Sequence, residues 1–410
     1  MKSNTPPRDS CGRRSAGKCQ MKTGAAIEYR RRSATRFLSA GLLLVLLCVR
    51  LPAAELGEGI QYWAISKPAV PLSMHVLEIR RGQPDLWLTV SVGARLKGNK
   101  TVPEMVAALS PEQGVSLAAV NGDYFEHKTE PRYFGTLEGL CIIDGELVAG
   151  PAGRAFCIDW DGQPQIRQVK ARFQVTWPTG KSTPFGLNCS PVDYKSEVKT
   201  AEVVLFTPRF GRSTGTTNVR ELVLVPVGKG PWLPLKTWQT YSASVSAVSS
   251  AGDTAIPTNG MVLSISKKAD AEIPTVRPGD ILRLSTAFDE DLSKIVAAIG
   301  GGPPLLENGR ILPKPVVPAQ RAPRTAVGLN ATNIFLVVVD GRQANLSIGM
   351  DIRELAEFMH ELGCTTALNL DGGGSSTFWL AGRVVNSPSD GKLRPVGNCL
   401  ILLRRPAHGY

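Results

Sequence analysis

NLDGGGSST, residues 369–377, is a polar, glycine-rich stretch between two apolar segments. The residues before it, Thr365 to Leu368, predict a short buried strand, and Thr377 to Leu380 predict another that ends in a tight turn at Ala381-Gly382. Three consecutive glycines lack Cβ atoms, so backbone N–H groups can converge on an anion beside the carboxylate of Asp371. The stretch predicts a binding loop between two strands, although a plain hairpin turn explains the glycines equally well.

Outward from this loop, most of the chain has the pattern of β-strands separated by turn residues. The apolar runs lie at 74–79, 86–92, 115–120, 137–143, 156–160, 173–177, 202–206, 221–227, 241–248, 261–265, 281–286, 334–339 and 399–403. Only two segments predict helices: one opens at Thr101 with Glu104 in the capping-box position, and the other runs from Asp351 to Leu362 before Gly363. We expect an α+β fold, a β-rich mixed sheet with few packing helices, whose active-site cleft is formed by loops at strand ends.

The N-terminal segment has the composition of an export signal. Residues 1–54 hold 11 of the 47 Lys/Arg but only 2 of the 35 Asp/Glu, and Arg36 directly precedes an apolar run from Phe37 to Val49. We expect a secretory signal at 1–54, cleaved near Ala54, and hence a secreted or periplasmic protein. The alternative is an uncleaved segment that anchors the chain in a membrane.

The remainder is expected to comprise an N-terminal β-rich region at 55–114 and a main domain at 115–405. Within this domain, 172–294 is expected to form an inserted or second β-rich lobe. Beyond residue 54 there are 36 Lys/Arg against 33 Asp/Glu, a balance of +3, which provides no electrostatic footprint for a nucleic acid.

Five of the eight cysteines lie beyond residue 54, with no CxxC pair and no His at ligand spacing, which argues against structural zinc. Cys141 with Cys157 is the favoured disulfide, because the pattern predicts that the two residues lie on neighbouring strands. Burial as unpaired small apolar residues is the alternative.

Four further clusters place polar or charged residues at the ends of predicted strands. They are Ala119–Phe125, Ala298–Leu306 with three glycines, Arg324–Arg342 with an Arg at its start and Asp340-Gly341-Arg342 at its end, and Val385–Pro395. Each cluster by itself is more often a structural turn.

Together and in this order the clusters resemble the phosphodiester glycosidase family, over about residues 115–403. The motifs that carry the resemblance are Asn121-Gly122-Asp123-Tyr124-Phe125, Gly300-Gly301-Gly302-Pro303, Arg324-Thr325-Ala326, Val339-Asp340-Gly341-Arg342, Asn369–Ser376, and Pro388-Ser389-Asp390 with Arg394-Pro395. Family members often have a small or apolar residue in place of Asp123, so the Asn121-Gly122 turn is carried over more firmly than that carboxylate. The family's lysosomal animal member continues into disulfide-rich modules, whereas this chain stops at Tyr410, so we expect a bacterial envelope enzyme of the same chemistry.

The resemblance implies hydrolysis of the sugar C–O bond in a sugar phosphodiester or a related exopolysaccharide linkage. The departing phosphomonoester has a second pKa of about 6 and needs little protonation. The main requirements are then anion binding and a carboxylate that faces the oxocarbenium-like sugar. The alternative is a non-catalytic envelope protein that binds glycans on the same fold.

The residues expected to serve this chemistry fall into two groups. The catalytic candidates are Asp371, Asp340, Asp390 and Arg324, with Asp123 as a further carboxylate. The candidates for binding substrate or phosphate are Asn121, Gly122, Arg342, Gly372, Gly373, Gly374, Ser375, Ser376 and Arg394. We expect Arg324, Asp340, Asp371 and Asp390 to line one cleft, with the 351–362 helix packed behind it. His127 and His360 lack motif support and are expected to matter little.

This chemistry requires no cofactor, although the same carboxylates also suit Ca²⁺ or another divalent cation. The expected partner is a carbohydrate-phosphate small molecule or a cell-envelope glycan. A membrane is a partner only if the N-terminal segment remains uncleaved.

Overall fold

The computed structural model describes residues 47–50, 56–67, 69–128, 131–192, 199–314 and 320–405. These residues all lie in one compact unit, Leu44–Tyr410. Most of the predicted signal segment falls outside them. Among the described residues, no helix has the length and apolar character needed to cross a membrane.

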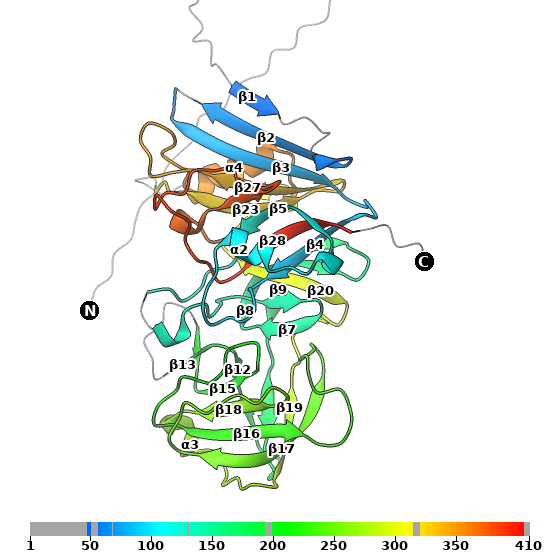
Figure 1. Ribbon diagram of the computed structural model, residues 1–410, viewed down its shortest axis with the longest axis vertical. Coiled ribbons are helices and arrows are strands. Elements are labelled where there is room, and N and C mark those ends of the chain that lie inside the picture. The colour runs from blue at the N-terminus through cyan, green and yellow to red at the C-terminus, as the bar shows by residue number, and fades with distance from the viewer. Residues whose placement is uncertain are drawn as a thin grey trace, which may run out of the picture. The chain divides into compact units, whose positions relative to one another are not determined.

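The fold is β-rich with few helices, as predicted, and its first large sheet has eight strands (Figure 1). All neighbours in this sheet are antiparallel. In spatial order the strands are β1 (Leu47–Arg50), β2 (Ile60–Lys67), β3 (Leu72–Arg80), β24 (Asn333–Val339), β23 (Arg324–Leu329), β25 (Thr366–Asn369), β21 (Pro304–Glu307) and β22 (Arg310–Ile311).

Two five-stranded sheets pack with the first sheet around one shared core. One contains, in order, β27 (Arg383–Val384), β26 (Phe378–Leu380), β5 (Val115–Asn121), β28 (Cys399–Arg404) and β4 (Leu86–Ser91). The other contains β7 (Glu146–Ala149), β6 (Cys141–Ile143), β20 (Ile295–Gly301), β8 (Ala152–Asp159) and β9 (Pro164–Lys170). A single apolar core joins the three sheets, with Leu336, Ile401 and Ile299 each fully buried.

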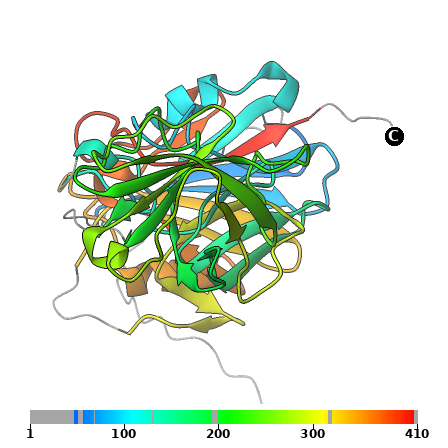
Figure 2. The ribbon, with the colours of Figure 1, turned by 90° about the horizontal axis from the view of Figure 1, so that it is seen from below.

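The fourth large sheet lies entirely within residues 172–294 and is drawn mostly in green in Figures 1 and 2. Its order is β11 (Ser182–Pro184), β10 (Gln174–Thr176), β19 (Ile281–Ser285), β17 (Thr240–Ser249), β16 (Arg220–Pro226), β18 (Met261–Ile265), β15 (Val203–Phe206) and β12 (Gly186–Leu187). The β12–β15 pair is parallel, so this sheet is mixed. A second core, which includes Trp177 and Leu263, lies between this sheet and the β6–β8–β20 sheet.

Both predicted helices are confirmed. Helix α2 (Val102–Ala107) begins after Thr101 with the expected capping box to Glu104. Helix α4 (Ile352–Glu361) begins after Asp351 with a second capping box, and Gly363 follows it with a φ of 83°. The apolar face of α4 packs on the first sheet in a third core, which places this helix behind the strand ends of that sheet.

The favoured Cys141–Cys157 disulfide is wrong: all five cysteines beyond residue 54 are free. Strand β20 lies between β6 and β8, pairing Ile299 with Cys141 and Ala298 with Cys157. Consecutive residues of a strand face opposite sides of a sheet, so the two thiols enter different cores.

The loop at 370–377 connects two sheets and is not a hairpin, because β25 and β26 belong to different sheets. The hairpin lies just beyond it, at the predicted turn, where Ala381 and Gly382 both have positive φ and Trp379 pairs with Val384.

Candidate active site

Strand register brings three distant parts of the chain to one edge of the first sheet. Arg324, the first residue of β23, pairs with Val339, the last residue of β24. Ala326 pairs with Asn369, the last residue of β25. The start of one strand and the exits of its two antiparallel neighbours therefore meet at a single edge.

A cavity of about 510 Å³ opens at this edge. Its described lining is Tyr124, Phe125, His127, Lys128, Glu138, Ala322, Arg324, Arg342, Asp371, Gly372, Gly373, Gly374 and Arg394. Of the four residues expected to share one cleft, Arg324 and Asp371 line this cavity, whereas Asp340 and Asp390 lie outside its lining.

Asp371 is held by the backbone on both sides. Its N–H donates to the carbonyl oxygen of Gly122 at 2.8 Å, and its own carbonyl accepts from Nδ2 of Asn121 at 2.7 Å. The N–H of Gly372 donates to Oδ1 of Asp371 at 2.8 Å. Burial raises the pKa of this carboxyl, and the hydrogen bonds from Ser375 and Gly372 oppose the rise, as do the positive charges nearby.

Each of the three glycines allows a close approach that a side chain would block. A Cβ on Gly372 would lie 2.7 Å from the carbonyl oxygen of Pro323, and one on Gly374 would lie 2.1 Å from Oδ2 of Asp390. Gly373 has a φ of 62° and faces the guanidinium of Arg342. The loop thus brings its backbone close to Pro323, Arg342 and Asp390. The N–H groups of Gly372 and Gly373 already donate to Oδ1 of Asp371 and to the carbonyl oxygen of Pro323, so the predicted convergence of these N–H groups on an anion is wrong.

Arg324 is fixed by carbonyl groups. Its Nε donates to the carbonyl of Met350 at 2.9 Å, and Nη2 donates to the carbonyl of Gln320 at 3.0 Å. Burial lowers the pKa of Arg324, and the positive charge of Arg342 lowers it further. A guanidinium that is partly desolvated and held in one orientation is suited to a phosphate.

Asp390 positions Arg394. Its Oδ2 accepts from Nε and Nη2 of Arg394 at 3.0 and 2.7 Å, and Nη1 of the same Arg lies 3.4 Å from Oγ of Ser375. Arg342 has a φ of 60°, an uncommon conformation for a residue with a side chain, and this turn directs it to Gly373.

Asp340 is an internal anchor. It is 1% exposed, and its carboxylate accepts from Ser73 at 2.8 Å, from Asn386 at 3.2 Å and from the N–H of Ser387 at 2.8 Å. His75 lies 3.2 Å from the same carboxylate. Because these partners come from β3 and from the chain after β27, Asp340 joins β24 to both.

Asn121, Gly122, Ser375 and Ser376 form a frame behind the cavity. Oδ1 of Asn121 accepts from Oγ1 of Thr325 at 2.7 Å, and that hydroxyl lies 3.3 Å from Oγ of Ser376. A Cβ on Gly122 would lie 2.2 Å from Ile299, so the two sheets approach closely at this glycine. These residues position Asp371 and do not line the cavity themselves.

Six cavity residues were not among the predicted site residues: Tyr124, Phe125, His127, Lys128, Glu138 and Ala322. Tyr124 lies within a quoted motif, and its hydroxyl accepts from Nδ2 of Asn369 at 2.7 Å and donates to Gly302 at 2.9 Å. The N–H of Glu138 donates to the carbonyl oxygen of Tyr124 at 2.9 Å, and this hydrogen bond holds Glu138 beside the cavity. His127, expected to matter little, also lines the cavity. No sequence pattern indicated Glu138 or His127, because only the path of an irregular loop brings them to the cavity.

Asp123 lies behind Tyr124 and is 2% exposed. Its carboxyl accepts from the N–H groups of Gly139 and Tyr124 at 2.6 and 2.8 Å, and burial raises its pKa to about 7. Among the residues that the structure describes, no three His, Cys, Asp or Glu side chains gather closely enough to hold a metal ion.

Comparisons with known proteins agree with the motifs. The sequence model of the phosphodiester glycosidase family matches residues 240–403. The N-acetylglucosamine-1-phosphodiester alpha-N-acetylglucosaminidase of Mus musculus is 41% identical over 68 residues, which cover 16% of this chain and 13% of that enzyme. The match thus spans a small part of the mouse enzyme.

Two solved structures are similar in fold. A hypothetical protein from Synechocystis superposes with a TM-score of 0.66 at 19% identity, over 85% of this chain and 62% of that one. A protein of Burkholderia pseudomallei superposes with a TM-score of 0.62 at 22% identity, over 83% of this chain and 74% of that one. The family match includes Arg324, Asp371 and Arg394. The predicted resemblance is confirmed: over residues 240–403 this chain matches the phosphodiester glycosidase family.

Proposed function

We propose that this protein hydrolyses the sugar C–O bond of a sugar phosphodiester or of a related exopolysaccharide linkage. The observation that supports this function is one cavity lined by Asp371 together with three arginines, Arg324, Arg342 and Arg394. A phosphodiester of a sugar needs this combination: cations for the phosphate and an anion for the developing positive charge of the sugar.

In the proposed reaction the three arginines bind the phosphate, beside the Gly372–Gly374 loop that lines the same cavity. The phosphate takes the bonding electrons as the C–O bond breaks, and it leaves as a monoester with a second pKa of about 6. Stabilisation of this leaving group by fixed positive charge replaces a general acid.

Asp371, in its ionised form, stabilises the sugar cation from the opposite side. Glu138 lines the same cavity and is the second carboxylate that could accept a proton from the attacking water. Asp390 acts through Arg394, and Asp340 through the loop that it anchors.

The test is an assay of the purified protein with UDP-N-acetylglucosamine, measuring the release of reducing sugar, with Asp371→Asn as the matched variant. In ¹⁸O-labelled water, cleavage of the sugar C–O bond should leave the released phosphate unlabelled. Label in the phosphate would instead indicate P–O cleavage and contradict the proposal. A panel of sugar phosphodiesters that bind tightly but are never hydrolysed would favour the non-catalytic glycan-binding alternative.

We propose that the reaction needs no cofactor, because the arginines already supply the positive charge that a cation would bring. Turnover should therefore be unchanged after dialysis against EDTA. Loss of activity that Ca²⁺ restores would show that the carboxylates hold a divalent cation.

We also propose that residues 1–54 direct the protein to the periplasm or the medium, where the partner is a carbohydrate phosphate or a cell-envelope glycan. Protein from the native host should then begin near Glu55. Such cleavage would remove β1 and leave β2 at the edge of its sheet. Recovery of an intact N-terminus in the membrane fraction would favour the anchored alternative.

A further inference from the structure

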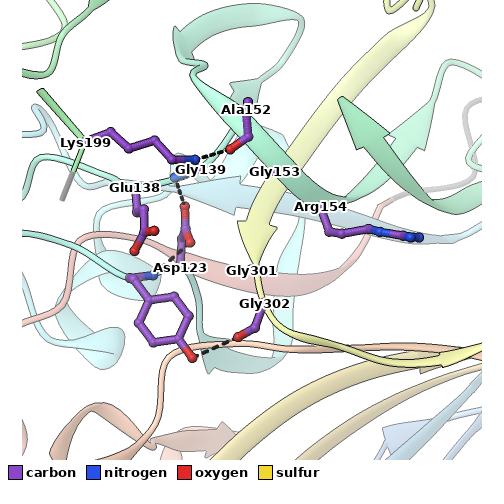
Figure 3. A pocket seen from close by; sticks show the side chains of 10 residues that line it. Asp123, Glu138, Gly139, Ala152, Gly153, Arg154, Lys199, Gly301 and Gly302 are labelled. Carbon is purple, nitrogen blue, oxygen red and sulfur yellow. Dashed lines mark hydrogen bonds between the residues drawn. The ribbon is translucent and has the colours of Figure 1, made fainter. Parts of the chain in front are cut away.

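A second cavity, of about 320 Å³, adjoins the candidate active site (Figure 3). Tyr124 and Glu138 line both cavities. The second cavity has polar walls: Asp123, Glu138, Arg154 and Lys199 line it with their side chains, whereas its four glycines contribute only backbone. In Figure 3, Gly302 lies at one end and Ala152 with Lys199 at the other.

A third cavity, of about 620 Å³, lies beyond that far end. It shares Ala152 and Lys199 with the second cavity, and the Nζ of Lys199 donates to the carbonyl oxygen of Ala152 at the junction. The second cavity thus adjoins both of the others, because it shares two lining residues with each of them. The first holds the arginines and Asp371, and the second is a polar passage.

The third cavity differs from the other two in chemistry. Most of its lining surface is apolar and comes from several elements, among them Pro151, Pro184, Phe185, Leu187, Ala201 and Ala269. Charged side chains also line it, namely Lys170, Lys199, Glu202, Lys268 and Glu272. Burial of hydrocarbon contributes about 25 cal/mol per Å² of apolar surface removed from water. A cavity of this size and lining therefore favours an apolar chain over a sugar ring, whose hydroxyl groups would lose their hydrogen bonds to water.

We propose that the third cavity binds a hydrocarbon chain esterified to the phosphate, so that the preferred substrate is a glycosyl phosphodiester of a long-chain alcohol. This inference rests on the proposed function, because the sugar and phosphate must occupy the first cavity. The chain then leaves the phosphate past Tyr124 and Glu138, follows the second cavity beside Gly153, and enters the third cavity alongside the hydrogen bond that joins Lys199 to Ala152.

The first experiment measures binding of butyl, hexyl, octyl and decyl phosphate to the unmodified full chain by titration calorimetry, below their micellar concentrations. Each buried methylene should strengthen binding about fourfold once the chain reaches the cavity. Affinity that does not change with chain length would overturn the proposal. Because this measurement needs no turnover, it is independent of whether the protein is a hydrolase.

The second experiment replaces part of the apolar wall of the third cavity with a further charge. Ala269 lines it from the first turn of α3 (Lys267–Asp270), where its N–H is already capped by Ser266, so an aspartate suits the helix. Ala269→Asp should reduce binding of decyl phosphate at least tenfold and leave butyl phosphate within twofold. Lys267→Asp is the control, because Lys267 belongs to the same turn and is absent from the described lining.

The same ladder of alcohols, esterified to N-acetylglucosamine 1-phosphate, separates the two proposals. If binding rises with chain length but no diester is hydrolysed, the proposed function is wrong and the apolar site stands. If all diesters are hydrolysed at equal kcat/KM and Ala269→Asp has no effect on the decyl diester, the apolar site is wrong and the hydrolase stands.

Discussion

Asp340 and Asp371 both begin an Asp-Gly pair just after a strand of the first sheet, β24 and β25, which flank β23. Their surroundings differ. Asp340 is surrounded by hydrogen-bond donors from β3 and from the chain after β27. Asp371 lines a cavity together with arginines, and, among the described residues, its carboxylate accepts hydrogen bonds only from its own loop, from Gly372 and Ser375. The comparison teaches that a carboxylate at a strand end can contact a substrate only where few groups of the protein donate hydrogen bonds to it.

The largest expected effect comes from Asp371→Asn, which keeps the shape and deletes the charge. We expect turnover of a sugar phosphodiester to fall at least about 10²–10³-fold, because a charge that faces a developing charge in a shielded site is removed. The unfolding midpoint should change little, since the substitution leaves the backbone contacts in place. Turnover that survives this change would place the carboxylate outside the reaction.

Arg324→Ala tests the opposite charge. We expect a loss of about 10²–10³-fold, because a fixed donor to the leaving phosphate is lost. Arg321→Ala is the matched control: Arg321 is close in sequence and is held in an ion pair with Glu354, but it is absent from the described lining of the cavity. Equal losses of turnover in the two variants would indicate that Arg324 stabilises this segment of the chain and does not bind the phosphate.

Asp340→Ala sharpens the contrast because its main effect should be on stability. Removing the carboxylate leaves buried donors unpaired, which costs on the order of 3 kcal/mol in the free energy of unfolding. Denaturant titration measures this cost, with the more exposed Asp390→Ala expected within about 1 kcal/mol of the unmodified protein. If Asp340→Ala were stable and inactive, Asp340 would have a chemical role after all.

The pH dependence should report the raised pKa of Asp371. Because the ionised form is required, the rate should increase with pH through an acid limb that lies above 3.8, the ordinary value for Asp. Arg394 lowers this pKa, so Arg394→Gln should move the limb to higher pH. The limb of the Arg321→Gln variant should stay in place. A limb that moves to lower pH in Arg394→Gln would contradict the assignment.

The smallest expected effect is that of His360→Ala, within about twofold, because a histidine in the last turn of α4 has no part in the cavity. His127→Ala should cost more, about tenfold, since His127 lines the cavity and its charge lowers the pKa of Asp371. Turnover of one sugar phosphodiester by each of the two variants shows which histidine contributes more. A large loss of turnover in His360→Ala would mean that proton transfer to the leaving group dominates the reaction and that Asp371 and the arginines are not its main catalytic groups.

Local patterns were sufficient for the secondary structure near the site. Thr101 and Asp351 began helices because a capping box involves residues only three apart, and the Ala381-Gly382 turn formed because two residues decide a tight hairpin. The Cys141–Cys157 pairing failed because nothing in the intervening sequence reveals that β20, far along the chain, inserts between their strands.

The sequence by itself determined the strand-rich fold class, the resemblance to the phosphodiester glycosidase family, and the motifs that supply Asp371 and the arginines. These depend on short-range periodicity and on contiguous residues. Only the tertiary structure decided that Asp340 is an anchor, that Asp390 positions Arg394, and that Glu138 and His127 line the cavity. The physical reason is that burial and hydrogen-bond partners are set by strand register between segments far apart in the chain, whereas a motif specifies only its own backbone.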